Sequence, residues 1–429
     1  MLDINFIREN PQQVKKGIVA KNFNPRLVDD FLALDEKWRE LVKKTDDFRS
    51  EQKKAGNNRE IEKAKELKIK IQNNEEQLKS VQKERERILY LIPNLPMEDV
   101  PVGKNESENQ FLRKWGEIPK FDFEPKDHLE LGEALDIIDV KMAADVSGSR
   151  FNYLKGELAM MEFAIVQYVF SILTDEKIIK KIAKKISPDF PAKPFVPVVP
   201  PVMIKPEVYT KMARLDPGQE EERFYLPKDN LYLIGSAEHT LGPLHMDQTI
   251  GESQLPLRYV GFSTSFRREA GSYGKDTRGI LRVHQFDKVE MESFSLPELS
   301  AKEQEFFVAI QEYMLRELKL PYQVMLLCTG DMGGPNAKQI DIETWIPSQN
   351  KYRETHSADF MADYQARRLN TKVKRLNGKT ELVHMNDATA FAIGRILIAI
   401  MENYQQKDGS IVIPKALQKY LGFKKIKKS

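Results

Sequence analysis

A repeating pattern of apolar residues between Leu27 and Ile92 constrains this fold more than any other feature of the sequence. Apolar side chains recur at alternating intervals of four and three residues, first up to Phe48 and then, after the breaker Gly56-Asn57-Asn58, from Ala64 onward. This heptad spacing is typical of a coiled coil. The short Gly/Asn turn predicts that the two helices fold back antiparallel, and at ~1.5 Å per residue the arm would be roughly 40 Å long.

The polar residues of this segment suggest two further properties. Asn74 and Arg85 lie on the seam, where they weaken it and can fix its register. From Lys37 to Arg87 there are 16 basic and 11 acidic residues, whereas the rest of the chain has slightly more acidic than basic residues. A local excess of basic residues is typical of a surface that binds phosphate groups. A solvated helix surface can have the same composition. The arm itself is compatible with a generic interaction coiled coil or with a probe that reaches a large partner.

The composition favours a soluble protein of two domains with a reducing, cytoplasmic location. The chain has 429 residues, of which 31% are charged. It contains no run of eighteen apolar residues, so we expect no membrane-spanning segment. Its N-terminus lacks the basic residues followed by apolar residues that are typical of a secretion signal. The single cysteine, Cys328, excludes an internal disulfide.

The region beyond the arm predicts a mixed fold. Residues 97–126 are rich in Pro, Gly, Asn and Glu and are expected to form a linker. Helical and strand-like runs then follow without alternating one for one, which argues against a doubly wound parallel sheet, and no Gly-rich phosphate loop occurs. The expected helices are 129–144, 156–173 and 302–318, and the expected strands are 195–204, 231–234, 258–268, 281–291, 322–328 and 340–346.

The segment Phe262–Ser293 carries the strongest chemical signal. Two strand-like runs flank the turn-rich stretch 271–279, which predicts an antiparallel hairpin with a long loop. Alternation places cations, carboxylates and an aromatic ring on one face, namely Arg267 and Glu269 of the first strand and Arg282, His284, Phe286, Lys288 and Glu290 of the second. Such a face suits a nucleotide triphosphate, because guanidinium groups pair with phosphate and rings stack on adenine; the alternative is a solvated face.

Two more clusters add weaker signals. Asp341, Glu343 and Trp345 alternate with apolar residues, so the carboxylates could hold Mg²⁺ beside a phosphate site or simply face solvent on an edge strand. Small residues at 386–390 are expected to begin an amphipathic helix that carries Arg395. That arginine either points into a site or extends its head to solvent.

Three blocks together resemble the motifs of class II aminoacyl-tRNA synthetases, and most closely those of the seryl-tRNA synthetases. Motif 2 is matched by 266–271, 276–279 and 282–290, motif 3 by Gly394-Arg395 with 402–405, and motif 1 by Pro200-Pro201-Val202. The arm and the segments 92–96, 146–151 and 365–368 also resemble this family, so the match covers essentially the whole chain.

The resemblance implies an α+β fold, in which an antiparallel catalytic sheet is flanked by helices and preceded by an antiparallel coiled-coil arm. It divides the chain into a tRNA-binding domain, 1–110, with the arm at about 27–92, and a catalytic domain, 111–429. The implied function is that of a serine–tRNA ligase, which converts L-serine and ATP to seryl-adenylate and transfers the seryl group to the 3′ end of tRNA(Ser). Whether selenocysteine tRNA is also charged stays open.

The resemblance also implies residue roles. The catalytic residues are Arg267, which holds the α-phosphate, Glu269 and Arg282. ATP is bound by Arg267, Glu269, Arg282, Phe286, Glu354, Ser357 and Arg395, and Mg²⁺ by Glu354 and Ser357. Serine is bound by Ser236, Glu238, Arg267, Glu290, Asp387 and Thr389. The implied protein is a cytoplasmic homodimer, and the arm, with basic residues such as Lys53, Lys54 and Arg59, would bind the long variable arm of tRNA(Ser).

The sequence departs from the family at a few positions in the amino-acid pocket. Asp387 stands where motif 3 normally has Asn, and His356 and Asp359 follow Glu354 in place of a run rich in Ser and Cys. Two other functions remain as alternatives: a synthetase-like enzyme that charges a carrier protein, and a non-catalytic tRNA-binding protein.

Overall fold

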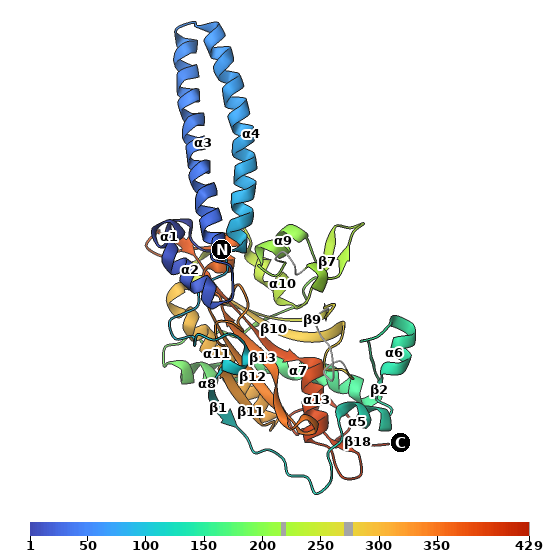
Figure 1. The fold of residues 1–429 in the computed structure, drawn as a ribbon. Coiled ribbons are helices and arrows are strands. Elements are labelled where there is room, and N and C mark those ends of the chain that lie inside the picture. Colours follow the sequence, from blue (N-terminus) through green and yellow to red (C-terminus); the bar gives the residue numbers. More distant parts are fainter. Residues whose placement is uncertain (216–219, 270–277, 429) are drawn as a thin grey trace. The chain divides into compact units, whose positions relative to one another are not determined.

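Two long helices follow the heptad pattern closely. Helix α3 covers Arg26–Asn57 and helix α4 covers Ile61–Leu91, and Figure 1 shows them as an antiparallel pair. They are preceded by the short helices α1 (Ile4–Glu9) and α2 (Pro11–Ala20). The structure, a computed structural model, describes residues 1–215, 220–269 and 278–428. The chain divides into the units Met1–Pro96 and Met97–Ser429.

The polar residues on the seam of the arm are paired across it. The side-chain amide of Asn74 donates to the carbonyl oxygen of Leu41 at 2.8 Å and to the hydroxyl of Thr45 at 2.7 Å. Arg85 forms an ion pair of 2.7 Å with Asp35, a carboxylate that the heptad pattern did not single out. These contacts fix how the two helices are paired, because a shift of one turn would leave buried polar groups without partners.

The second unit is built on an eight-stranded sheet with the order β1-β11-β12-β13-β16-β10-β9-β4. All neighbours are antiparallel except β4 and β9. The strands are β1 (Gln110–Trp115), β4 (Val196–Val198), β9 (Leu257–Phe266), β10 (Gln285–Ser295), β11 (Tyr322–Leu326), β12 (Lys338–Ile346), β13 (Lys351–Phe360) and β16 (His384–Ala392). The expected mixed fold with an antiparallel sheet and flanking helices is confirmed.

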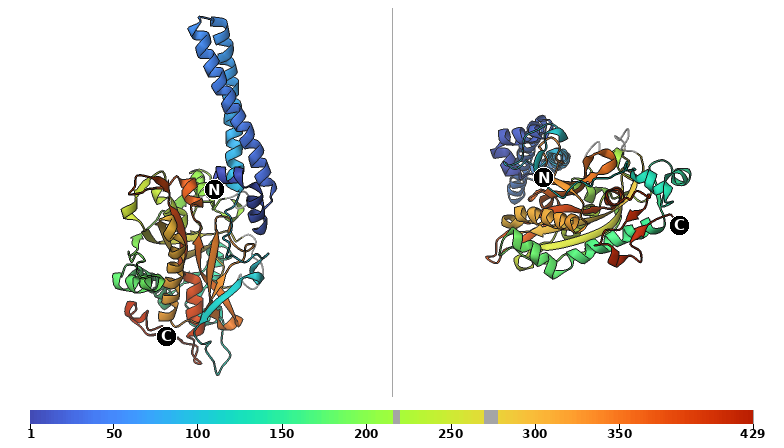
Figure 2. Two further views of the ribbon diagram at one scale, coloured as in Figure 1. Left: turned by 90° about the vertical axis from the view of Figure 1, so that its left-hand side faces the viewer. Right: turned by 90° about the horizontal axis from the view of Figure 1, so that it is seen from below.

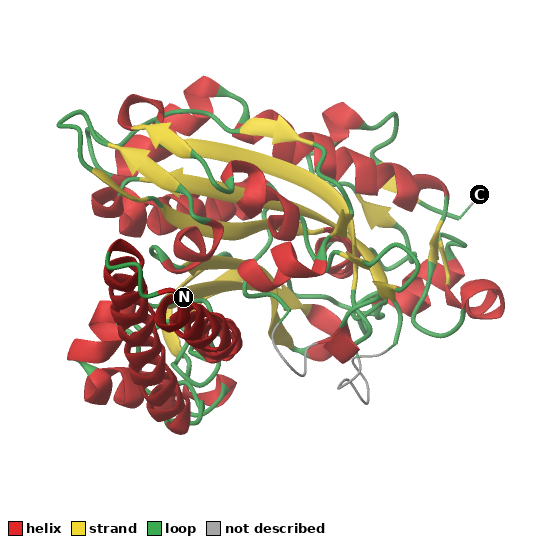
Figure 3. Cartoon of the chain, turned by 90° about the horizontal axis from the view of Figure 1, so that it is seen from above, coloured by secondary structure: helices red, strands yellow, loops and turns green. Residues whose placement is uncertain are grey.

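Helices pack against this sheet and form the main core with it (Figures 2 and 3). They are α7 (Gly156–Leu173), α8 (Glu176–Ile186), α11 (Ser300–Glu317) and α13 (Ile393–Asn403). Val289 and Met291 of β10 point into this core. The alternate residues of the same strand therefore face the other side of the sheet, which leaves that side for polar chemistry.

Shorter elements surround the sheet. The helices are α5 (His128–Ala134), α6 (Val140–Ser147), α9 (Pro206–Lys211), α10 (Glu238–Leu241) and α12 (Tyr364–Leu369). The strands are β2 (Ile138–Asp139), β3 (Tyr153–Leu154), β5 (Met203–Ile204), β6 (Tyr225–Leu226), β7 (Leu231–Leu233), β8 (Thr249–Gly251), β14 (Lys372–Lys374), β15 (Thr380–Leu382), β17 (Ile411–Val412) and β18 (Lys425–Ile426).

Several expected elements differ in the structure. The residues 386–390 belong to strand β16, and the helix that carries Arg395 begins only at Ile393; a strand between two others overrides the local preference of small residues. The expected linker 97–126 contains β1, which pairs with β11 at the edge of the sheet. The expected helix 129–144 is interrupted by Asp136, whose φ is +53°. The hairpin loop expected at 271–279 lies largely outside the described residues.

Helix α7 bears on the expectation about membranes. It has 18 residues with a mean hydropathy of 1.4, so by length and composition this helix is apolar enough to span a membrane. In the structure Leu158, Met161, Ile165 and Val169 of α7 are fully buried in the core of the second unit. Packing against the sheet explains this buried face of α7, whereas Met160 and Phe163 of the same helix are exposed.

Candidate active site

One cavity of about 280 Å³ lies over strands β10, β13 and β16. It gathers residues that are far apart in the sequence, from Arg214 to Arg395. Eleven of the residues expected in the site line it: Glu238, Arg267, Glu269, Arg282, Phe286, Glu290, Glu354, Ser357, Asp387, Thr389 and Arg395. Ser236 does not line the cavity but lies beneath it, fully buried, with its hydroxyl donating to Oε1 of Glu290 at 3.1 Å.

Two β-bulges decide which side chains reach the cavity. Where β12 pairs with β13, Ile342 lies opposite His356, and the next residue of β12, Glu343, lies opposite Glu354. Thr355 of β13 has no partner on β12 and is the extra residue of this bulge. Glu354 and Ser357, three positions apart, therefore both face the cavity.

The second bulge has the same effect on strand β16. Thr389 pairs with Glu290 and Phe391 with Val289, which leaves Ala390 as the extra residue. Thr389 lines the cavity while Phe391 is buried in the core, whereas strict alternation would have placed both on one face.

One half of the cavity collects arginines and a ring. The guanidinium of Arg267 lies 5.2 Å from the ring centroid of Phe286, and its Nε donates to the carbonyl oxygen of Gly235 at 3.0 Å. Arg395 forms an ion pair of 3.1 Å with Glu354. Burial raises the pKa of Glu354, but Arg395, together with Lys288 and Arg267, holds that pKa below its usual value. Fixed positive charge next to an aromatic face is the chemistry that a nucleotide phosphate and base require.

The loop ends of the hairpin complete this half. Arg267, Glu269 and Arg282 lie beyond the ends of β9 and β10, so they do not share a strand face with the rest of the hairpin, which corrects the expectation from alternation. Arg282 approaches Glu269 at 3.6 Å. His284 is not among the cavity residues, because its Nδ1 lies 3.0 Å from the carbonyl oxygen of Arg267 and its ring packs against Phe151.

The other half is a network of hydroxyl and carboxylate groups. The hydroxyl of Thr389 donates to Oε1 of Glu290 at 3.0 Å, and Lys288 contacts the same carboxylate and donates to the hydroxyl of Ser236 at 3.0 Å. Burial raises the pKa of Glu290 to about 7, even though Lys288 opposes that shift. One oxygen of Glu238, Oε2, has no hydrogen-bond partner within the described parts of the chain. Such a network can recognise a small polar group, because each of its members needs a partner when water is excluded.

The donors expected for Mg²⁺ fit a hard cation. Glu354 and Ser357 present a carboxylate and a hydroxyl on one strand to the same cavity. Magnesium usually takes one or two carboxylates together with substrate phosphates, so an oxygen-only pair beside the arginines is suitable. Among the described residues no group of three or more His, Cys, Asp or Glu side chains is arranged to hold a metal by itself.

Four charged residues of the cavity were given no role from the sequence: Arg214, Lys288, Asp331 and Asp359. Arg214, which follows helix α9, lines it beside Asp359 and Asp387. Arg214 lies far from every motif in the sequence, so no local pattern indicated it. Lys288 was expected on the polar face of the hairpin, because it alternates with Phe286 and Glu290 along β10, but it was given no role in the site.

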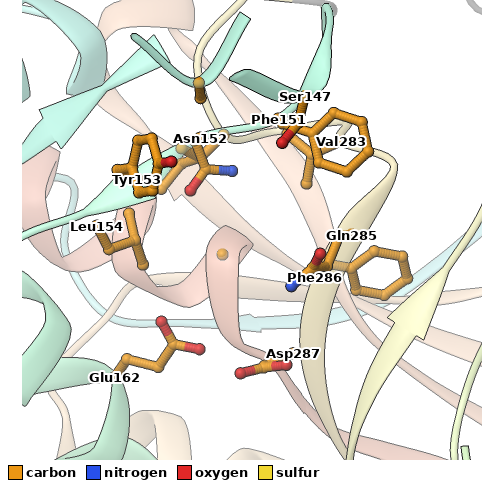
Figure 4. A pocket seen from close by; sticks show the side chains of 13 residues that line it. Ser147, Phe151, Asn152, Tyr153, Leu154, Glu162, Val283, Gln285, Phe286 and Asp287 are labelled. Atoms are coloured by element: carbon orange, nitrogen blue, oxygen red, sulfur yellow. The ribbon is translucent and has the colours of Figure 1, made fainter.

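A second cavity of about 340 Å³ adjoins the first and shares Phe286, Ile280, Val283 and Gly394 with it. Figure 4 shows that the carboxyl groups of Glu162 and Asp287 point toward each other along one side of this cavity. Burial, with a further contribution from Asp287, raises the pKa of Glu162 to about 8. Burial and the nearby carboxyl group of Asp287 thus favour the protonated form of Glu162.

The basic residues expected to bind tRNA lie at the tip of the arm. Lys53 and Lys54 are exposed in the last turns of α3, and Arg59 is exposed in the turn that leads to α4. Arg59 has a φ of +59°, which forms part of the tight reversal between the two helices.

Comparisons with known proteins agree across both units. Residues 1–96 match the seryl-tRNA synthetase N-terminal domain, and residues 223–404 match the tRNA synthetase class II core domain (G, H, P, S and T). The serine–tRNA ligase of Pseudothermotoga lettingae is 40% identical over 98% of this chain and 99% of its own length. That of Thermotoga maritima is 41% identical over 99% of this chain and 100% of its own length.

Two solved structures extend this similarity. The seryl-tRNA synthetase of Pyrococcus horikoshii, complexed with ATP, superposes with a TM-score of 0.89 at 36% identity over 100% of both chains. The cytoplasmic serine–tRNA ligase of Naegleria fowleri, in complex with AMP, gives a TM-score of 0.86 at 30% identity over 100% of this chain and 99% of that one.

Proposed function

This chain belongs to the seryl-tRNA synthetase family, and from that membership we propose how its residues carry out the reaction. It is a serine–tRNA ligase, which uses ATP to attach serine to tRNA. The observation that carries the residue assignments is the convergence of Arg267, Arg282 and Arg395 with the Glu290–Thr389 network in one cavity.

The arginine half of the cavity takes ATP. Phe286 and Arg395 enclose adenine, Arg282 and Arg395 hold the outer phosphates, and Arg267 holds the α-phosphate. The carboxylate oxygen of serine attacks the α-phosphorus and forms a new O–P bond, while the bond from the α-phosphorus to the oxygen that bridges to the β-phosphate breaks. The products are seryl-adenylate and pyrophosphate. Negative charge builds on the α-phosphate in this step, so the fixed guanidinium of Arg267 stabilises the transition state.

A magnesium ion would be held by Glu354 and Ser357 together with phosphate oxygens. When bound, it supplies positive charge that neutralises the triphosphate. Glu354 is already ionised through its contact with Arg395, so its carboxylate is in the form that a cation requires.

The network half takes serine. Glu290 and Thr389 read the side-chain hydroxyl, Glu238 and Ser236 shape the place of the α-ammonium group, and Asp387 lies two residues from Thr389 on β16, at the side-chain end of the pocket. A buried network built to bond a hydroxyl rejects alanine strongly, because alanine leaves its polar groups unpaired. In the second step a hydroxyl of the terminal ribose of tRNA attacks the seryl carbonyl carbon, and AMP leaves.

The arm binds tRNA(Ser) through the phosphates of its long variable arm. Lys53, Lys54 and Arg59 are exposed at the arm's tip, where cations meet a ribose-phosphate backbone without reading its bases. Because its substrates include tRNA and ATP, the proposed location of the enzyme is the cytoplasm.

The active enzyme is a homodimer. Helix α7 exposes Met160 and Phe163, with 54% and 58% of their surface accessible, and the segment after β4 exposes Val199 at 87%. Pro200 follows directly, in the segment that resembles motif 1. An apolar surface of this kind is expected to be covered by a second copy of the chain.

Serine-dependent exchange of pyrophosphate into ATP, followed by charging of tRNA(Ser), tests this function. Exchange with serine but not alanine, together with acceptor activity, is the expected result. Exchange without tRNA charging would favour an enzyme that loads a carrier protein. Binding of tRNA without exchange would favour a non-catalytic tRNA-binding protein.

A further inference from the structure

Three carboxylates form a row across the sheet, and two of them, Asp359 and Asp387, line the cavity. Asp387 on β16 pairs directly with Asp359 on β13 and with Glu292 on β10. Residues directly opposite on neighbouring strands point to the same face, and like charges in such positions repel. All three are buried, with 6% of Asp359, 4% of Asp387 and none of Glu292 accessible.

Arg214 is the cation that faces this row. Its Nη2 donates to Oδ2 of Asp387 at 2.9 Å and lies 3.6 Å from Oδ2 of Asp359. Neither carboxylate oxygen of Glu292 has a hydrogen-bond partner in the described parts of the chain. Burial, together with the neighbouring Asp387, raises the pKa of Glu292 well above its usual value. Burial also raises the pKa values of Asp359 and Asp387. Arg214 opposes these shifts, so its guanidinium is the charge that keeps carboxylates of the row ionised.

The loop that carries Arg214 is anchored from below by helix α12. The side-chain amide of Gln365 donates to the carbonyl oxygen of Met212 at 2.9 Å, and Arg368 donates to that of Thr210 at 3.1 Å. The backbone that leads to Arg214 is therefore held by the fold, and Asp387 holds the guanidinium itself; a group that selects substrates requires such support.

The row lies one step beyond the groups proposed to read serine. Thr389 and Asp387 are two residues apart on β16, about 7 Å along a strand. Both line the cavity. A serine hydroxyl held by Glu290 and Thr389 ends before the row, whereas a side chain longer by one carbon extends toward it.

Resting on the proposed function, we propose that Arg214 is a specificity-determining residue, which excludes amino acids with a short cationic side chain. The guanidinium of Arg214 is already paired with the carboxylates of the acidic row. An ammonium group on the side chain of a substrate would therefore meet this guanidinium instead of free carboxylates. Without Arg214, the row becomes a site for such an ammonium group.

Homoserine and 2,4-diaminobutyrate test the proposal, because they have side chains of equal length and differ in charge. The measurement is inhibition of serine-dependent pyrophosphate exchange, expressed as the ratio of the inhibition constant of homoserine to that of 2,4-diaminobutyrate. In Arg214→Gln this ratio should rise roughly tenfold or more over the unmodified enzyme, since a full charge is removed next to the bound ammonium. The KM for ATP should stay within a few-fold.

Three matched variants separate charge from structure. Arg214→Lys keeps the charge and should leave the ratio unchanged. Arg214→Gln combined with Asp387→Asn removes one charge of each sign and should return the ratio toward that of the unmodified enzyme. Asp387→Asn alone makes the site more positive and should lower the ratio, and it provides the test if Arg214→Gln does not fold.

A ratio that is the same in all variants would overturn the proposal and leave Arg214 with a structural role. A rise in Asp387→Asn would overturn it as well. Failure of the proposed function is a separate result, because it would appear as the absence of serine-dependent exchange in the unmodified enzyme.

Discussion

The guanidinium of Arg267 lies over the ring of Phe286, with its Cζ 5.2 Å from the ring centroid. Arg267 follows the last residue of β9 and Phe286 is the second residue of β10, so the contact joins the two sides of one hairpin. The residue proposed for the α-phosphate thus lies directly beside the residue proposed for adenine. The hydrogen bond from Nε of Arg267 to the carbonyl oxygen of Gly235 also holds the guanidinium between the two halves of the cavity.

Replacing Arg267 with alanine should abolish adenylate formation without unfolding the protein. Removal of one donor to a developing oxyanion costs roughly 3–4 kcal/mol, about 10²–10³ in rate. Pyrophosphate exchange measures this loss. Arg268→Ala is the matched control, since its guanidinium lies 4.5 Å from the Phe224 ring and it does not line the cavity. Near-normal exchange in Arg267→Ala would remove the nucleotide assignment of the hairpin.

Asp387→Asn should change the KM for serine several-fold and leave that for ATP within a few-fold. Asp387 holds Arg214 at 2.9 Å in the amino-acid half, away from the pair of Arg267 and Phe286. Initial rates of exchange, with each substrate varied in turn, provide the measurement. Equal effects on both substrates, or none on either, would contradict this placement.

Shortening the arm should separate the two steps of the reaction. Replacing Leu41–Lys79 with a short turn removes the basic tip but keeps the ion pair of Asp35 and Arg85 at 2.7 Å, which closes the base of the arm. No cavity residue is removed, so exchange should be retained while tRNA charging fails. The slope of log K for tRNA against log salt should become shallower by roughly 0.7–0.9 for each phosphate that the shortened arm no longer binds.

A milder variant neutralises Lys53, Lys54 and Arg59 and should weaken tRNA binding less. The matched control neutralises three exposed lysines of helix α8, Lys177, Lys180 and Lys181, and should leave the salt slope unchanged. Normal tRNA affinity in the shortened protein would refute the role of the arm even if the enzyme assignment stands.

Glu162→Gln should stabilise the protein at high pH and not at low pH. The pKa of Glu162 is raised from 4.5 to about 8 in the folded chain. The folded state therefore binds its proton more tightly than the unfolded state, and stability is lost as pH rises from 4.5 to about 8. The variant avoids this loss, so above pH 8 its free energy of unfolding should exceed that of the original by about 1–3 kcal/mol.

Thermal unfolding at pH 5 and pH 9 measures that difference. Glu157→Gln, in the first turn of the same helix, is the control and should show no such dependence on pH. A gain in stability of Glu162→Gln that is equal at both pH values would contradict the cause given for the shift.

Phe163→Glu should convert the dimer to a monomer. Phe163 is 58% exposed on α7, and a carboxylate there would be buried without a partner in an apolar interface. Sedimentation velocity gives the oligomeric state. Phe111→Glu, on the edge strand β1 at 51% exposure, is a control of similar accessibility. An unchanged dimer in Phe163→Glu would place the interface elsewhere.

Much of the site could be predicted because the residues that form it follow local patterns in the sequence. Phe286, Lys288 and Glu290 alternate along β10, and the structure confirms that all three line the cavity. The helix expected to begin at 386–390 was wrong, because a strand buried between two others is stabilised by its neighbours, which a local pattern does not contain. Arg214 was missed for the same reason, since its partner Asp387 lies 173 residues away.

The sequence by itself determined the arm from Leu27 to Ile92, because heptad spacing reports contacts between two helices joined by a short turn. Only the tertiary structure decided which residues of β13 and β16 face the cavity. The bulge at Thr355 turns Glu354 toward it, and the bulge at Ala390 turns Phe391 away from it into the core. A bulge depends on how a strand pairs with its neighbour, and that pairing joins distant segments of the chain, so no local period in the sequence contains it.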